Sequence, residues 1–243
     1  MDTTYYHLEQ MGSPAIVASA KGDVTGDGIV DNVFLTGTRT PDSPYIQNIT
    51  LMIEDGRTGQ RKRATLKTNS GYNPTLFLGD FTGDGISDIL IGIASGGSGG
   101  MTYNYVYSDA MNTLRLLFDY EVFNNAYQYT VQYLNDYRVR ITNQTRNIQY
   151  IVDITYKGKE YLDEIYDSKG KLKEPISGFV NPIGGVFPVD FDGNGVYELF
   201  IFQRVAGRYN ADGLGYLQTT LQWDGRQFAF EDQYMAVFGA EVK

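Results

Sequence analysis

The chain has 243 residues, a formal net charge of −9, no cysteine and a single histidine, His7. The negative charge argues against nucleic acid as a partner, because phosphate binding needs a basic face. The absence of cysteine excludes disulfides and thiolate chemistry, and one histidine nearly excludes a histidine-based triad or a poly-histidine metal centre.

An acidic loop occurs three times along the chain, at residues 23–31, 80–88 and 190–198. Each copy places oxygen-bearing side chains at loop positions 1, 3, 5 and 9, and glycine at positions 4 and 6. A hard cation such as calcium takes roughly six to eight oxygen ligands from a flexible loop, and glycine at position 6 permits the sharp turn. The sequence therefore predicts up to three calcium ions, with these ligands: Asp23, Thr25, Asp27, Asp31, Asp80, Thr82, Asp84, Asp88, Asp190, Asp192, Asn194 and Glu198.

The three loops differ from an EF-hand, which opens in a similar way. An EF-hand closes with a bidentate glutamate at position 12 of its loop, whereas that position here holds Phe34, Ile91 and Ile201. Short apolar runs rich in β-branched and aromatic residues stand on both sides of the loops, which is typical of strands buried on both faces. We therefore expect each loop to join two strands of a hairpin.

The spacing of the loops predicts a repeat architecture. The loops begin at residues 23, 80 and 190, so they are 57 and 110 residues apart. A copy without metal ligands is expected near residue 135, where Asn135 and Asp136 are followed by Tyr137 and Arg138. The chain then divides into four units of a repeat protein. The expected bounds are about 15–70, 71–124, 125–180 and 181–243.

Each unit has room for four short strands. In the first unit we expect strands near 15–22, 31–37, 45–54 and 60–67, and in the second near 75–80, 87–94, 101–108 and 113–120. Repeated four-stranded units around an axis make a β-propeller. The prediction is an all-β fold in one domain covering residues 1–243: a small propeller of four blades, each with four antiparallel strands. A partial propeller completed by another copy or partner is the alternative.

The loop pattern resembles that of the FG-GAP and VCBS repeat family, the calcium-loop propellers that include the integrin α-chain head. The family pattern, D-x-[DNT]-G-[DN]-G-x-x-[DE] between two strands, matches all three loops. The resemblance implies a propeller with calcium in the hairpin between strands 1 and 2 of a blade. Two departures stand out: many members have seven blades, and the third unit here lacks the loop.

Closure of a propeller would require the first and last blades to pair, since open strand edges invite aggregation. Residues 3–8 have a strand pattern and are one candidate for an outer strand of the last blade. The tail at residues 235–238 is the other candidate, and the sequence does not choose between them.

The sequence also bears on where the protein works. No apolar run approaches the roughly 18 residues of a transmembrane helix, and no signal peptide is visible at the amino terminus. Weak calcium modules work outside cells, where calcium is millimolar. We therefore expect an extracellular or cell-surface location, with a cytoplasmic or spore-associated one as the alternative.

A binding module is the function that these features favour. The loops opposite the acidic loops carry tyrosine and arginine, which tend to anchor interfaces, and integrin-like propellers use that face for ligands. The expected ligand residues are Arg39, Tyr45, Tyr72, Asn73, Arg146, Arg208 and Tyr209. The prediction is a non-enzymatic calcium-binding propeller that binds a protein or polysaccharide at a bacterial surface. The alternatives are a structural component of a surface layer or spore coat, and a polysaccharide-active enzyme or its accessory domain.

Overall fold

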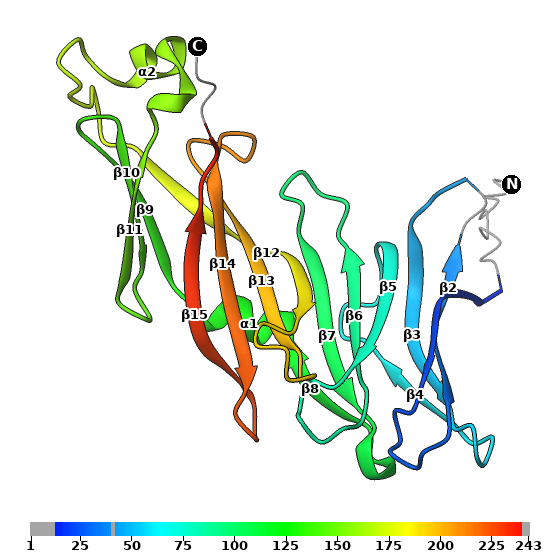
Figure 1. Ribbon diagram of the computed structural model, residues 1–243. Coiled ribbons are helices and arrows are strands. Elements are labelled where there is room, and N and C mark those ends of the chain that lie inside the picture. The colour runs from blue at the N-terminus through cyan, green and yellow to red at the C-terminus, as the bar shows by residue number, and fades with distance from the viewer. Residues whose placement is uncertain (1–12, 40–41, 240–243) are drawn as a thin grey trace, which may run out of the picture.

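The computed structural model describes residues 13–39 and 42–239, and the predicted all-β class is confirmed. Fifteen strands in this part of the chain form three antiparallel sheets, and the only two α-helices described, α1 (Tyr120–Ala126) and α2 (Lys159–Ile165), are short. The sheets follow one another in a row, with the first sheet at one end and strands β9–β11 at the other (Figure 1). His7 and the strand expected at 3–8 lie outside the described residues.

The first sheet contains the four strands of the first predicted unit. They are β1 (Ala15–Gly22), β2 (Asp31–Arg39), β3 (Ile46–Glu54) and β4 (Arg61–Thr65), in that order across the sheet. On β2 and β3, alternate apolar residues such as Val33, Leu35 and Leu51 are buried, while their neighbours are partly exposed. This period of two places one face of the sheet against the second sheet and leaves the other face to solvent.

The second sheet repeats this order. It contains β5 (Tyr72–Gly79), β6 (Asp88–Ala94), β7 (Thr102–Ser108) and β8 (Arg115–Asp119). Strand β6 lies between two layers, so that Ile89, Leu90 and Ile91 are all buried, as predicted for a strand covered on both faces. The four strands of each of the first two units therefore lie close to their predicted positions.

The remaining strands form one C-terminal sheet of seven. Its order is β11 (Ile148–Asp153), β10 (Arg138–Asn143), β9 (Tyr129–Leu134), β12 (Ser177–Val189), β13 (Glu198–Ala206), β14 (Gly213–Trp223) and β15 (Phe228–Ala236). The sheet curves so far that its two edge strands approach each other: the Tyr150 hydroxyl donates to the Gln233 carbonyl at 2.8 Å, and the Arg146 guanidinium lies 4.3 Å from the Phe230 ring centroid. Residues 235 and 236 belong to β15, so part of the C-terminal tail does supply an outer strand.

The expected boundary between a third and a fourth blade, near residue 180, is wrong. Strand β12 crosses it, and Ser177 and Gly178 pair with β9. The third unit has three strands before β12 instead of the expected four, and residues 159–165 of that unit form helix α2. Because β9 runs antiparallel to β12, the β9–β10 turn lies at the opposite end of the sheet from loop 190–197. The described residues thus form an open row of sheets rather than a ring of four separate blades.

The hairpin expected at 125–142 is confirmed. Arg138 pairs with Leu134, and β9 and β10 continue in register to Asn143 and Tyr129. Asp136 and Tyr137 both have positive φ, 59° and 57°, which is the conformation of the tight turns that join such strands.

Two apolar clusters hold the layers together. The first combines the inner faces of the first and second sheets with Leu199, Ile201 and other residues of the C-terminal sheet. The second lies inside the curved C-terminal sheet and includes Val205 and Leu217. The Lys62 ammonium and Asp109 carboxylate, 2.6 Å apart, add a link between the first two sheets.

Candidate functional site

The three acidic loops share one hydrogen-bond pattern. The position 1 carboxylate accepts from the backbone amides of positions 4 and 6: Asp23 accepts from Gly26 at 2.7 Å and from Gly28 at 2.8 Å. Asp80 and Asp190 make the same two contacts in the other loops. Each loop is therefore wound around its first acidic side chain.

The later loop positions are equally regular. The position 5 oxygen of Asp27, Asp84 and Asn194 accepts from the amide two residues later, and the position 9 carboxylate accepts from the amide of position 2. The glycines at positions 4 and 6 all have φ between 73° and 88°. Other residues adopt that region at a cost, which explains why glycine recurs there.

Three buried oxygen atoms in these loops have no hydrogen-bond partner: Thr25 Oγ1, Thr82 Oγ1 and Asp88 Oδ1. Asp88 itself is 1% exposed, and this burial raises its pKa to about 6. Burial also raises the pKa of Glu198, the third position 9 acid. Buried polar atoms usually have a hydrogen-bond partner. These three oxygens have none among the described residues, so they are the loop atoms available to bind a ligand.

The acidic side chains point mainly at backbone amides. Within residues 13–39 and 42–239, no three histidine, cysteine, aspartate or glutamate side chains gather at the spacing of a metal site. The loops instead combine carboxylate and backbone oxygens with a threonine oxygen in the first two loops and an asparagine oxygen in the third. A donor set made only of oxygen suits a hard cation such as calcium rather than zinc or copper.

The first loop differs from the others because the positively charged side chain of an arginine contacts it. The Arg57 Nε lies 2.7 Å from Asp27 Oδ2, the carboxylate at position 5 of the loop. We expect Arg57→Gln to tighten calcium binding at this loop, since it removes a competing positive charge. Calorimetric titration would measure this change. Arg61→Gln is the matched control, because Arg61 pairs with Glu54 instead, and an equal effect of both substitutions would contradict the prediction.

The predicted ligand residues do not form one site. Tyr45 and Tyr72 pack edge to face with ring centroids 5.2 Å apart, next to Asn73, while Arg39 ends β2. Arg146 lies far along the chain on the C-terminal sheet, over the Phe230 ring.

Arg208 is engaged within the fold rather than free to bind. Its guanidinium lies 2.8 Å from Glu164 Oε2 and 4.7 Å from the Tyr161 ring centroid, while the Tyr209 side chain is exposed. These residues therefore lie apart from the Tyr45–Tyr72 pair and from Arg146.

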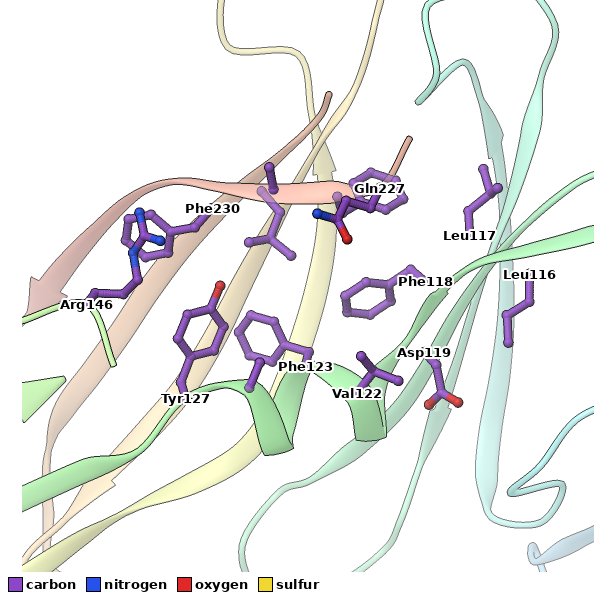
Figure 2. Close-up of a pocket in the computed structure, with 14 residues that line it drawn as sticks. Leu116, Leu117, Phe118, Asp119, Val122, Phe123, Tyr127, Arg146, Gln227 and Phe230 are labelled. Atoms are coloured by element: carbon purple, nitrogen blue, oxygen red, sulfur yellow. The ribbon is translucent and has the colours of Figure 1, made fainter. Parts of the chain in front are cut away.

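An apolar groove that the sequence did not reveal lies between the second and C-terminal sheets (Figure 2). Its volume is about 590 Å³, and it is bounded by β8, α1 and the edge strand β15. Phe123 and Tyr127 point from the α1 side toward the strand that carries Phe230. Asp119 and Arg146 supply charge at its margins. The only sequence signal was the alternation of Phe228 and Phe230 on β15, which is common in ordinary strands.

A buried polar cluster, also missed by the sequence reasoning, surrounds Asp212. Its carboxylate accepts from Lys157 Nζ at 2.7 Å and from the hydroxyls of Tyr161 and Tyr133 at 2.7 and 3.2 Å. Burial opposes the charge of Asp212, but the bonds from Lys157, the Arg208 amide and Tyr161 hold its pKa below the usual value. Burial also raises the pKa of both tyrosines. Every oxygen of the Asp212 carboxylate is satisfied, so the cluster is suited to holding α2 and the 207–212 loop in place.

Comparison with known proteins places the chain in a family. A family model described as the YybI C-terminal domain matches residues 127–236, the range of the curved C-terminal sheet. A protein of Bacillus subtilis (strain 168) described as "Uncharacterized protein YybI" is 51% identical over 238 residues, which cover 98% of this chain and 91% of that protein. No solved structure matches the chain. The identity over almost the whole length shows that the chain belongs to the YybI family.

Proposed function

We propose that this protein is a non-enzymatic, calcium-stabilised binding module that works at a bacterial surface. The observation that carries the proposal is the threefold recurrence of one loop, with the same oxygen positions, the same hydrogen bonds and the same positive φ at two glycines. Polar turns that bind no ligand have no reason to share the same oxygen positions and hydrogen bonds in three distant segments. The resemblance to FG-GAP and VCBS loops supports calcium as the ion.

The residues present fit such an ion. The unpartnered Thr25 Oγ1, Thr82 Oγ1 and Asp88 Oδ1 belong to ligand positions 3 and 9. In the third loop Asp192 replaces threonine at position 3. A bound cation would offset the burial of Asp88 and Glu198 and supply a partner for the free oxygens. Such an ion would stabilise the loops by neutralising carboxylates that are held close together.

We interpret the sheets as propeller-like blades in an open row. The first and second sheets each have four antiparallel strands with an acidic loop between strands 1 and 2, and β12–β15 repeat that order. The family's closed ring is not needed for the calcium proposal, since each loop takes its oxygens from one hairpin.

The surface location rests on the calcium chemistry, since weak calcium sites fill where the ion is millimolar. No helix in the described part of the chain is long and apolar enough to cross a membrane.

The groove between β8, α1 and β15 is the binding site that we propose for a protein or polysaccharide partner. Aromatic side chains line it, and Arg146 is the one predicted ligand residue that reaches it. Aromatic and arginine side chains carry much of the energy of many interfaces. Burial of Phe118 and Phe123 at its base, 6.2 Å apart, makes this site more rigid than an exposed loop.

A glycan array and capture of labelled surface proteins would test this function. With a ligand found, we expect Arg146→Ala to weaken binding by about 1 kcal/mol or more, as an interface anchor does. Arg39→Ala is the control, because Arg39 is exposed and absent from the groove. Turnover of a bound glycan would instead favour an enzyme, and a partner whose binding survives Arg146→Ala but not Tyr209→Ala would move the site to the 207–212 loop.

A further inference from the structure

Neighbouring sheets in the row are joined by one repeated contact between their acidic loops. The amide at position 8 of each following loop donates to the carbonyl at position 1 of the preceding loop. Ser87 donates to Asp23 at 3.2 Å, and Tyr197 donates to Asp80 at 2.8 Å. The same bond therefore links the first sheet to the second and the second to the C-terminal sheet.

Side-chain packing repeats along with this bond. The residue at position 7 of the following loop lies over the glycine at position 4 of the preceding one. A Cβ at Gly26 would meet Ile86 Cδ1 at 2.4 Å, and a Cβ at Gly83 would meet Val196 Cγ2 at 3.6 Å. Each loop thus has a receiving side, at positions 1 and 4, and an inserting side, at positions 7 and 8.

The inserting side of the first sheet is not covered by any other described part of the chain. Ile29 and Val30, at positions 7 and 8 of the first loop, are 42% and 58% exposed. Among the described residues the Val30 amide has no hydrogen-bond partner. On the same sheet, Ile16 and Phe34 line a shallow pocket of about 390 Å³ together with polar residues, among them Lys21, Glu54 and Arg61. The apolar part of this end is therefore the loop tip at Ile29 and Val30, which no other described residue covers.

The receiving side of the C-terminal sheet is likewise uncovered within residues 13–39 and 42–239. No atom lies within 4 Å of a Cβ placed at Gly193, position 4 of the third loop. On the outer face beside it, Phe187 and Phe191 are 48% and 55% exposed and pack edge to face on Phe202 and Phe200. A contiguous exposed aromatic face of this kind marks an interaction surface.

We propose that these two ends bind each other in separate copies of the chain. The first loop of one copy takes the place that a following loop would take at the third loop of its neighbour. The Val30 amide then faces the Asp190 carbonyl, as Ser87 faces Asp23 within one chain. Within one chain the ends cannot meet, because the second sheet lies between them (Figure 1).

Charge permits this pairing. Arg57 pairs with Asp27 at the inserting end and offsets its charge, which limits repulsion from the exposed Asp192 at the receiving end.

The residue before each loop also fits. A Cβ at Gly79 would lie 2.7 Å from Phe77 Cε1 and 2.9 Å from the Tyr197 ring, so a larger residue there would require these rings to shift. Val189 stands at this place in the third loop, and the inserting copy offers the smaller Val30. The contact joins two different surfaces, which builds a closed ring or an open filament from identical copies.

Sedimentation at a series of concentrations tests this proposal. We expect the average mass of the wild-type protein to rise with concentration. Val30→Asp, which alters only the inserting end, and Phe187→Asp, which alters only the receiving end, should each weaken self-association at least about tenfold. Ile151→Asp is the matched control, because Ile151 is an exposed apolar residue on β11 and belongs neither to the first loop nor to the aromatic face around Phe187. Melting curves identify any variant that fails to fold, and Ile29→Asp and Phe191→Asp then replace it.

Mixing the two variants separates this contact from a symmetric one. Val30→Asp keeps an intact receiving end and Phe187→Asp an intact inserting end, so an equimolar mixture should form a dimer with one copy of each and nothing larger. A wild-type protein that stays monomeric at every concentration would overturn the proposal. Self-association of either variant alone at wild-type strength, or a mixture that stays monomeric, would also overturn it. The two proposals have different readouts, since this one is tested by the mass of the assembly and the calcium proposal by the melting temperature in chelator.

Discussion

Adding a calcium chelator should lower the melting temperature of the purified protein. A ligand that binds only the native state adds about 2.7 kcal/mol of stability at a hundredfold excess over its dissociation constant. For a chain of this length each kcal/mol corresponds to roughly 2–4 °C, so even one vacated site should shift the melt by about 5–10 °C. Without the ion, the loop carboxylates also repel one another.

Single substitutions assign this effect to the loops. Asp84→Ala removes the position 5 oxygen of the second loop, which no basic side chain contacts in the described structure, and should reproduce part of the chelator effect. Asp163→Ala is the control, because Asp163 forms an exposed pair with Lys159 on α2. Differential scanning calorimetry with and without chelator measures both. An identical melt in calcium and in chelator would reject calcium as a stabilising ion.

Replacing Asp212 should destabilise the C-terminal sheet more than any substitution on the surface. Removing one partner of a buried ion pair typically costs about 3–5 kcal/mol, because the other charge stays buried without compensation. In Asp212→Ala, the Lys157 ammonium would be the buried charge left without a partner, since its side chain is only 16% exposed. The hydroxyls of Tyr133 and Tyr161 would also lose their acceptor.

Urea unfolding measures this loss, and two further variants interpret it. Asp163→Ala again serves as the control and should stay within about 0.5 kcal/mol of the wild type. The double variant Asp212→Leu/Lys157→Met should recover part of the loss, since an apolar pair leaves no unpaired charge. A single Asp212→Ala variant as stable as the wild type would show that the cluster does not hold α2 and the 207–212 loop.

The two proposals for this protein answer different questions. Calcium would explain why three distant loops share one oxygen pattern, whereas contact between copies would explain why Val30 at one end of the row and Phe187 and Phe191 at the other are exposed. A structural component of a surface layer or spore coat, the first alternative drawn from the sequence, would be consistent with such contact between copies. A structural component of this kind would assemble from copies of the chain alone, without a separate ligand.

The sequence by itself determined the local structure of the first two sheets and of the three acidic loops. Alternation of buried and exposed residues places strands such as β2 and β6, and glycine at loop positions 4 and 6 requires the conformation that the structure contains. These features depend on neighbours a few residues apart, so a period of two and a turn motif are enough to predict them.

Only the tertiary structure decided how the units assemble. The direction of β9 against β12, the union of seven strands in one curved sheet and the meeting of Lys157 with Asp212, 55 residues away, depend on long-range pairing that no local pattern encodes. For the same reason the sequence did not show that the predicted ligand residues lie in separate places. It also did not reveal the groove or the exposed residues at the two ends of the row. A repeat in sequence specifies each hairpin, but the packing of sheet faces decides whether the row closes.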